Sequence, residues 1–213
     1  MDNYKKYFRL VLKKYFPEEW ATLQMAIDSD FVSMEPHIRF AKHSKNPVDR
    51  RLAFAGYFLS TIKILEKEYV EFEKIKQIVI EIALEYVKPK SKLHLFFKKL
   101  PALLIGSKLG DIFIGIFKKK VQKRAHPDGF VVNILTNKAE ILGYDYGFDI
   151  IECGICKLYN KLGYEKYASI LCEVDHITSN LAGLTLIRTG TIANGAKKCD
   201  FRFQKRADTN FTN

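Results

Sequence analysis

The strongest constraint on the fold is a change in the sequence pattern at Pro127-Asp128-Gly129. Before this tripeptide, apolar residues recur at spacings of three and four, which places them on one face of a helix. After it, short runs of β-branched and aromatic residues are separated by turn signals, which is typical of strands. Helices followed by antiparallel strands predict a protein of the α+β class.

The N-terminal part predicts a series of amphipathic helices. Their apolar spacing covers residues 4–16, 17 to about 31, 48–69, 71–87 and 93–121. Pro36 should interrupt or restart the second of these helices, and Asn46-Pro47 should cap the third. The last stretch indicates two helical pieces, which are split around Pro101 and Gly106. We expect these helices to form a scaffold for the C-terminal part.

The C-terminal part predicts four strands and two helices in the order β-β-α-α-β-β. The strands are expected over residues 130–135, 143–151, 184–192 and 199–204, and the helices over 152–162 and 164–180. The strands should form an antiparallel meander, with Asn194-Gly195 as a hairpin turn. We therefore divide the chain into a helical part (1–125), an α+β part (126–206) and a C-terminal tail (207–213), packed as one unit.

The charge of the chain favours an anionic partner. Lys and Arg number 35 against 24 Asp and Glu, which gives a net charge of +11. Most of the excess lies on scattered lysines, and the basic run Lys118-Lys119-Lys120 has no aromatic residues between its charges. We therefore expect no nucleic acid partner. The most apolar region is broken by several charges, so we expect no membrane span.

All four cysteines lie in the C-terminal quarter of the chain, at positions 153, 156, 172 and 199. The N-terminus shows no uninterrupted apolar segment of the kind that directs secretion. We therefore predict a cytoplasmic protein with reduced thiols rather than a disulfide scaffold. A Cys-x-x-Cys pair without a second pair is weak evidence for zinc.

One helix of this quarter carries three chemical groups at close spacing. Cys172, Asp175 and His176 follow each other at i, i+3 and i+4, so they share one helix face. A thiol, a carboxylate and an imidazole at this spacing can bind a divalent metal or form a nucleophile and its base. The alternative is a small buried cysteine beside a solvated Asp-His pair.

The quarter also carries an ordered set of short motifs. They are Cys153, Leu162-Gly163, Leu171-Cys172-x-x-Asp175, Arg188-Thr189-x-Thr191 and Gly195-x-x-x-Cys199-Asp200-Phe201-Arg202-Phe203, with His126-Pro127-x-Gly129 further upstream. This set resembles the L-2-amino-thiazoline-4-carboxylic acid hydrolase family. The resemblance covers roughly the last 90 residues, whereas the first half fits only as generic helix.

The resemblance implies a hydrolase of cysteine metabolism. Its reaction opens a cyclic isothiourea at the carbon between sulfur and nitrogen and yields N-carbamoyl-L-cysteine. It implies Cys153, Cys172 or Cys199 as nucleophile or metal ligand and Asp175 as general base or ligand. A small anionic substrate would be bound by Arg188 and Arg202, on neighbouring strands of one sheet face, and by Thr189 and Thr191. A divalent metal such as zinc, if present, would be held by Cys153, Cys172, Cys199 and His176.

A more distant resemblance gives the alternative. The ending Gly195-x-x-x-Cys199-Asp200-Phe201 on a last strand is similar to the ligand-binding domains of the 4-vinyl-reductase type, which are related in fold to TRAPP subunits. This resemblance implies a non-enzymatic module that binds a small molecule or a metal. Fold analogy does not choose between the two, and a homo-oligomer is left open.

Overall fold

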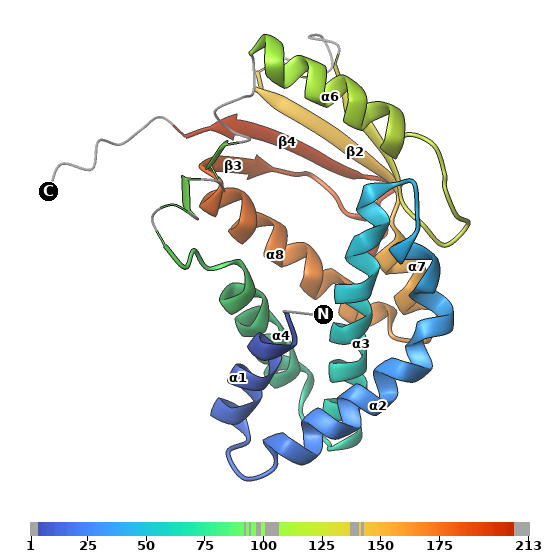
Figure 1. The fold of residues 1–213 in the computed structure, drawn as a ribbon, viewed down its shortest axis with the longest axis vertical. Coiled ribbons are helices and arrows are strands. Elements are labelled where there is room, and N and C mark those ends of the chain that lie inside the picture. Colours follow the sequence, from blue (N-terminus) through green and yellow to red (C-terminus); the bar gives the residue numbers. More distant parts are fainter. Residues whose placement is uncertain are drawn as a thin grey trace, which may run out of the picture.

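The computed structural model describes residues 4–91, 93, 95–96, 99–100, 107–136, 141 and 143–206. A single antiparallel sheet has the strand order β1-β2-β4-β3. The strands are β1 (Val131–Leu135), β2 (Tyr146–Glu152), β3 (Leu184–Ile187) and β4 (Cys199–Lys205). The helices that surround the sheet confirm the predicted α+β class (Figure 1).

Helices cover both faces of the sheet. The described α-helices are α1 (Lys5–Tyr15), α2 (Trp20–Ile38), α3 (Arg51–Lys67), α4 (Phe72–Val87), α6 (Lys108–Val121), α7 (Gly154–Lys161) and α8 (Ala168–Leu181). Helix α8 lies between the sheet and the N-terminal helices, whereas α6 lies across the opposite face (Figure 1). The predicted break around Pro101 and Gly106 and the tail 207–213 lie outside the described residues.

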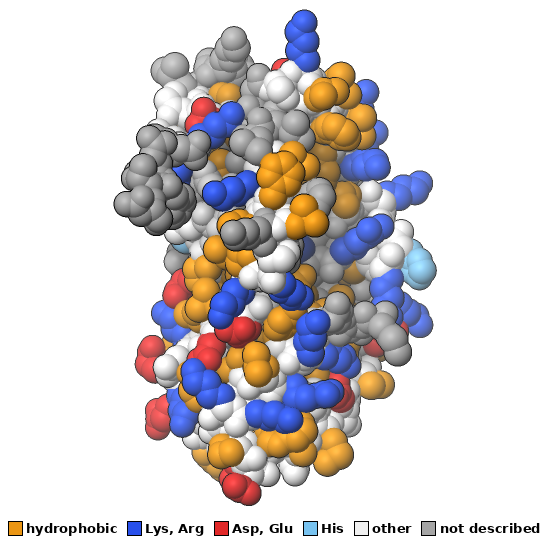
Figure 2. Space-filling view, turned by 60° about the vertical axis from the view of Figure 1, so that its left-hand side comes forward, with side chains coloured by type: hydrophobic (Ala, Val, Ile, Leu, Met, Phe, Trp, Pro, Cys, Tyr) orange, Lys and Arg blue, Asp and Glu red, His pale blue; other side chains and the backbone are white. Residues whose placement is uncertain are grey.

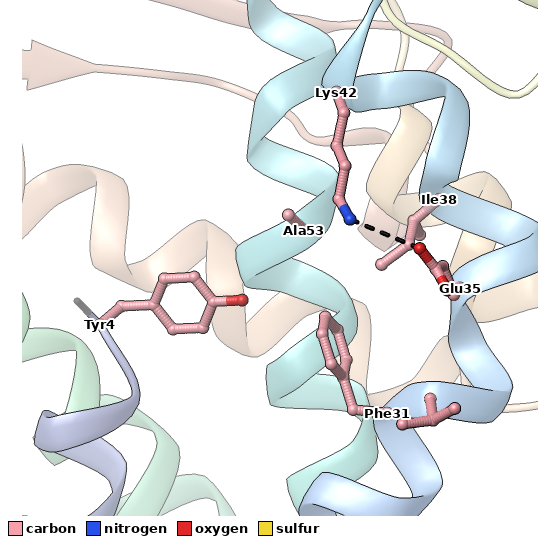
Figure 3. A pocket seen from close by; sticks show the side chains of 7 residues that line it. Tyr4, Phe31, Glu35, Ile38, Lys42 and Ala53 are labelled. Carbon is pink, nitrogen blue, oxygen red and sulfur yellow. Dashed lines mark hydrogen bonds and ion pairs between the residues drawn. The ribbon is translucent and has the colours of Figure 1, made fainter. Parts of the chain in front are cut away.

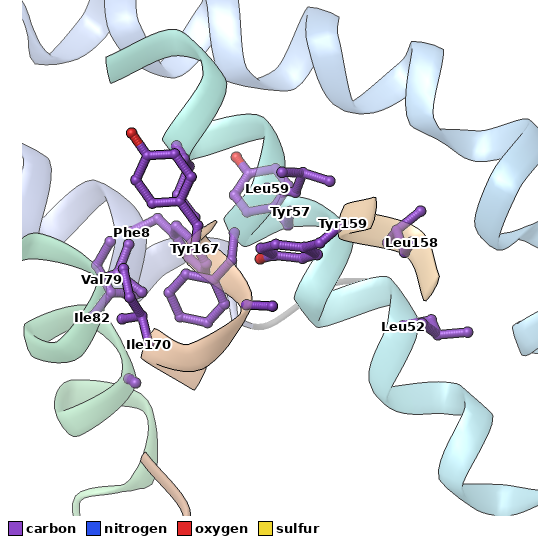
Figure 4. Close-up of a cluster of buried hydrophobic side chains, with 14 of the residues drawn as sticks. Phe8, Leu52, Tyr57, Leu59, Val79, Ile82, Leu158, Tyr159, Tyr167 and Ile170 are labelled. Atoms are coloured by element: carbon purple, nitrogen blue, oxygen red, sulfur yellow. The ribbon is translucent and has the colours of Figure 1, made fainter. Parts of the chain in front are cut away.

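The two halves of the chain share one hydrophobic core. Figure 4 shows Phe8, Tyr57 and Val79 from the N-terminal helices close to Tyr159 and Tyr167 from the C-terminal part. The Tyr159 hydroxyl donates a hydrogen bond to the Ala55 carbonyl at 3.2 Å, which fixes α7 against α3. The N-terminal helices therefore support directly the segment that carries the first two cysteines.

A polar tie joins the segment before α3 to the start of the sheet. Asn46 caps the 3-10 helix Pro47–Arg50, as predicted, by accepting from the Val48 N–H at 3.0 Å. Its side-chain amide donates to the Phe130 carbonyl at 2.9 Å, and Asp49 accepts from the Phe130 N–H at 2.8 Å. Asn46 and Asp49 are fully buried, so these bonds satisfy groups that water does not reach.

The topology differs from the predicted meander in the place of β4. This strand lies between β2 and β3, so the sheet consists of the hairpins β1-β2 and β3-β4 joined by a β2-β4 pair. The helices α7 and α8 separate β2 from β3 in sequence, and they carry the chain to the far edge of the sheet. An alternating pattern shows which residues form strands but not the order of the strands.

The third strand is also shorter than predicted. It ends at Ile187 rather than Ile192, because the N–H groups of Thr189 and Gly190 donate to the Asp200 carboxylate. The Asn194-Gly195 pair does not form a two-residue hairpin turn. It ends the short 3-10 helix Ile192–Asn194 with Gly195 at φ +86°, inside a longer connection.

Pro36 does not break its helix, since α2 continues to Ile38. The proline removes one backbone N–H from the last turn, and the helix ends two residues later, at Ile38. The predicted helix 152–162 begins two residues late, at Gly154. The second helix, expected from residue 164, begins at Ala168 after a 3-10 turn (Glu165–Tyr167).

Helix α6 presents apolar side chains to the solvent. Leu109, Ile112, Phe113, Ile116 and Phe117 are between 41 and 64% exposed. The helix ends in Lys118-Lys119-Lys120, and Figure 2 shows hydrophobic side chains mixed with Lys and Arg on one face of the molecule. None of the described helices combines the length and hydrophobicity that crossing a membrane requires.

Candidate active site

The first candidate residue, Cys153, lies where β2 passes into α7. It directly precedes the helix in an extended conformation, so its sulfur lies at the N-terminus of α7. Gly154 allows this arrangement, because a Cβ at this position would lie 3.0 Å from the Asp128 carbonyl oxygen and from the Phe130 ring. The close approach of α7 to the start of β1 therefore depends on the glycine.

The surroundings of Cys153 favour its thiolate. A hydrogen bond from the Cys156 thiol holds the pKa of Cys153 below its usual value, and the N–H groups of Cys156 and Ile155 add to this effect against the opposing effect of burial. The same thiol–thiol hydrogen bond raises the pKa of Cys156, as does burial. Cys153 is therefore the more easily deprotonated thiol of the pair, and Cys156 is the hydrogen-bond donor.

The other two cysteines lie close by but remain protonated. Burial raises the pKa of Cys172 to about 12, with a further contribution from the negative charge of Asp175. Burial also raises the pKa of Cys199, whose sulfur accepts a hydrogen bond from the Ile192 N–H at 3.2 Å. Cys153, Cys172 and Cys199 each lie near enough to Cys156 to affect its pKa, so the four cysteines occupy one region of the molecule.

Arg188 links α8 to the sheet beside this group. Its guanidinium donates to the Asp175 carboxylate at 3.0 Å and to the Cys172 carbonyl at 2.9 Å. It also lies over the ring of Phe201, 4.9 Å from the ring centre, and only 6% of its side chain is exposed. Burial raises the pKa of Asp175, whereas the positive charges of Arg51 and Arg188 lower it. Arg188 and Asp175 therefore form a largely buried ion pair, with 23% of the Asp175 side chain still exposed.

Arg202 does not join this group, because it projects from the opposite face of the sheet. Arg202 pairs in register with Ile187, so the next residue, Arg188, points to the other side. The Arg202 guanidinium donates to the buried Asp149 carboxylate at 2.9 Å, and Lys198 binds the second oxygen at 2.7 Å. The expectation that the two arginines share one face is wrong.

Three hollows surround the cysteine group. The first, of about 400 Å³, is lined by Cys153 and Cys156 together with Lys157 and Lys197. The second, of about 490 Å³, is shallow and is lined by Arg188, His176, Thr189 and Thr191 among others. The third, of about 380 Å³, lies between the N-terminal helices and α8 and includes Asp175. Cys153, Arg188 and Asp175 thus line three different hollows.

A further hollow, of about 150 Å³, lies away from the cysteines, and it is lined by Tyr4, by α2 and by Ala53 of α3. Figure 3 shows the Tyr4 and Phe31 rings there and the ion pair between Lys42 and Glu35, which the structure places at 3.4 Å. It contains none of the sequence-predicted site residues. We therefore consider the hollow at Cys153 as the candidate active site.

A family model described as L-2-amino-thiazoline-4-carboxylic acid hydrolase matches residues 50–203, which is most of the chain. The chain belongs to the L-2-amino-thiazoline-4-carboxylic acid hydrolase family. Neither the curated proteins nor the solved structures contain a match. The more distant resemblance to the 4-vinyl-reductase fold therefore stays a prediction.

The family match includes all of the candidate site residues, from Cys153 to Arg202. The matched region begins at residue 50, so it includes α3 and α4 as well as the sheet, α7 and α8. The N-terminal helices that the sequence predicted as generic scaffold are thus in part inside the family unit. Of the predicted residues, the structure joins Arg188 to Asp175 and to the Cys172 carbonyl, and Cys153 and Cys199 lie in the same region of the molecule.

The resemblance left open whether a metal is bound, with Cys153, Cys172, Cys199 and His176 as its suggested ligands. In the described ranges, no three His, Cys, Asp or Glu side chains form a group that can hold a metal ion. His176, the fourth suggested ligand, is exposed and lines the shallow hollow rather than the one at Cys153. The zinc site that the sequence suggested therefore stays a prediction.

Two functional candidates were missed by the resemblance. Cys156 is the direct partner of Cys153, and Lys197 is an exposed cation on the rim of the same hollow. The signal for Cys156 was present, because a Cys-x-x-Cys pair at a helix start places both thiols on one turn. No comparable signal identifies Lys197, which lies among other lysines in a loop.

Thr189 and Thr191 belong to the loop that follows β3. The Thr189 hydroxyl donates to the Asp200 carboxylate at 2.7 Å, which organises the loop rather than leaving the hydroxyl free. The Thr191 hydroxyl is buried and has no hydrogen-bond partner among the described residues. Their predicted role in substrate binding stays a prediction.

Proposed function

We propose that this chain hydrolyses L-2-amino-thiazoline-4-carboxylate or a closely related cyclic isothiourea, with Cys153 as the nucleophile. The supporting observation is the environment of Cys153. It is the cysteine whose pKa is lowered, and it lines a hollow of about 400 Å³. A thiolate in contact with a ligand-sized space is the requirement for covalent catalysis.

The first step opens the ring. The Cys153 thiolate attacks the ring carbon between sulfur and nitrogen, a bond forms from Cys153 to this carbon, and the bond from the carbon to the ring sulfur breaks. The electron pair of that bond leaves with the ring sulfur as a thiolate, so no proton is consumed. The product of this step is an isothiourea on Cys153 that contains every atom of the substrate.

The second step releases the product. Water adds to the isothiourea carbon, and the bond to Cys153 breaks with its electron pair on the sulfur. Of the two protons of this water, one goes to the former ring nitrogen and the other to the substrate thiolate, so the sum is one substrate and one water giving N-carbamoyl-L-cysteine. The Cys156 thiol and the N–H groups at the start of α7 stabilise Cys153 as the leaving thiolate in this step.

The substrate carboxylate needs a cation near Cys153. Lys197 is exposed on the rim of the hollow, whereas Lys157 is already bound to Glu152 and to the carbonyls of Pro127 and Gly129. We assign the carboxylate to Lys197. Asp175 acts at a distance as a positioning residue, since it orients Arg188 and lines a different hollow.

The test is thiol release from L-2-amino-thiazoline-4-carboxylate, followed with the wild type and with Cys153→Ser. We expect release by the wild type, its loss in the variant, and an intact fold by circular dichroism. Rapid acid quench and mass spectrometry should show an adduct on Cys153 with the mass of the whole substrate. Thiol release that persists in Cys153→Ser would refute the assignment of Cys153 as the nucleophile. No thiol release by the wild type would refute the proposed substrate.

A further inference from the structure

The third hollow indicates a second ligand site, separate from the hollow at Cys153. The third hollow, of about 380 Å³, is enclosed by residues of α3, α4, α7 and α8. Its lining is mainly apolar and includes the aromatic rings of Phe54, Phe58 and Tyr86. This volume lies at the small end of the range of roughly 300–1,000 Å³ that is typical of ligand pockets.

Two adjacent arginines give this apolar hollow a positive side. Arg50 and Arg51 lie at the start of α3, line the hollow and are exposed. Within the described residues, neither guanidinium has a hydrogen bond or an ion pair. By contrast, Arg188 and Arg202 are each bound to an aspartate. Arg50 and Arg51 therefore keep their donors available for a ligand.

Among the described residues that line the hollow, Asp175 is the only carboxylate, and it does not neutralise these arginines. Asp175 lies near enough for the charge of Arg51 to lower its pKa against the effect of burial. Its carboxylate is bound at 3.0 Å by Arg188, which approaches from the sheet side of α8. Two positive charges thus face one acid that already has a partner, and the hollow favours an anionic ligand.

We propose that this hollow binds a small organic carboxylate with an aromatic or branched apolar body. The carboxylate accepts hydrogen bonds from Arg50 and Arg51, for which the planar guanidinium is suited. The apolar body lies among Phe54, Phe58 and Tyr86, where it leaves water.

This site is separate from the thiol chemistry proposed above. Ile155 of α7 lines the apolar hollow, whereas Cys153 and Cys156 line the other one. The inference therefore does not rest on the hydrolase mechanism. The two sites share one structural connection, since Asp175 lines the apolar hollow and also holds Arg188, which binds the Cys172 carbonyl.

The test is isothermal titration of the full chain with 3-phenylpropionate and with the neutral 3-phenylpropionamide. We expect saturable binding of the acid and at least tenfold weaker binding of the amide. Arg51→Gln and Arg50→Gln should each weaken acid binding about tenfold, which is the size expected for a charge-assisted hydrogen bond. Arg39→Gln is the matched control, because Arg39 is an exposed arginine outside the hollow.

Two further variants test whether the sites are separate and where the ligand binds. Cys153→Ser should bind 3-phenylpropionate as the wild type does, because it does not line this hollow. Val174→Phe should weaken binding of the acid, since Val174 lines the hollow and a ring there fills it without changing any charge. Equal affinity for acid and amide, equal effects of Arg39→Gln and Arg51→Gln, or no saturable binding of the acid up to millimolar concentration would overturn the proposal.

Discussion

The buried ion pair between Arg188 and Asp175 gives the sharpest prediction about stability. Replacement of Arg188 by Gln removes a guanidinium whose side chain is 6% exposed and leaves Asp175, 23% exposed, without its partner. Breaking such a pair costs about 3–5 kcal/mol when both groups are fully buried. Since Asp175 retains some contact with water and with the charge of Arg51, we expect about 3 kcal/mol.

The size of this effect is measurable by chemical and thermal denaturation. For a chain of this length, about 3 kcal/mol corresponds to a decrease in melting temperature of roughly 6–12 °C. Arg124→Gln is the control, because Arg124 forms an exposed ion pair with Glu152 and its loss should cost under about 1 kcal/mol. A double-mutant cycle of Arg188→Gln with Asp175→Asn should show a coupling of about 1–3 kcal/mol.

The pH dependence of the variant gives an independent check. Removal of Arg188 removes a positive charge that lowers the pKa of Asp175, so this pKa rises further above its usual value. An acid whose pKa is higher in the folded state stabilises the fold at low pH, and this contribution is lost as the pH rises through the folded pKa. The deficit of Arg188→Gln should therefore be larger at pH 8 than at pH 5. A deficit no larger than that of Arg124→Gln, together with no coupling, would refute the buried-pair reasoning.

Two further predictions concern the thiols and the polar tie. Cys156→Ala should raise the pKa of Cys153, because alanine removes the thiol that donates a hydrogen bond to its sulfur. Iodoacetamide labelling of Cys153 should therefore need a higher pH than in the wild type, and labelling profiles that coincide would show that Cys156 does not lower the pKa of Cys153. Asp49→Ala should lower the free energy of unfolding by about 2–3 kcal/mol, because the buried N–H of Phe130 loses its acceptor. The control Asp111→Ala, on the exposed side of α6, should change the free energy of unfolding by less than about 0.5 kcal/mol. Equal effects of the two variants in denaturant titrations would count against a stabilising role of the Asp49–Phe130 hydrogen bond.

The sequence predicts the elements of this fold better than their arrangement. The helical spacing around α3 and α4 and the alternation in β4 are local signals, and the structure confirms them. The position of β4 between β2 and β3 depends on pairing between segments about 50 residues apart, which no local pattern contains. The shortening of β3 likewise depends on Asp200, whose carboxylate takes the N–H groups of Thr189 and Gly190.

The same distinction explains which of the candidate side chains the sequence could place close together. Cys172 and Asp175 lie one turn apart on a helix, so the sequence alone places them together. Arg188 and Arg202 lie on two strands, and a shift of one residue in the register decides whether their side chains meet. The observed register separates them and pairs Arg202 with Asp149, an acid that the family motifs did not include.

The role of the N-terminal helices follows from how Cys153 is held. An activated thiol needs the start of α7 at a fixed position, and α7 is too short, at eight residues, to be stable alone. It is fixed on one side by the hydrogen bond from Tyr159 to Ala55 of α3 and on another by the close packing of Gly154 against Phe130. Phe130 is in turn bound through both backbone groups by Asn46 and Asp49, at the entry to α3. The environment that lowers the pKa of Cys153 therefore depends on docking of the helical part.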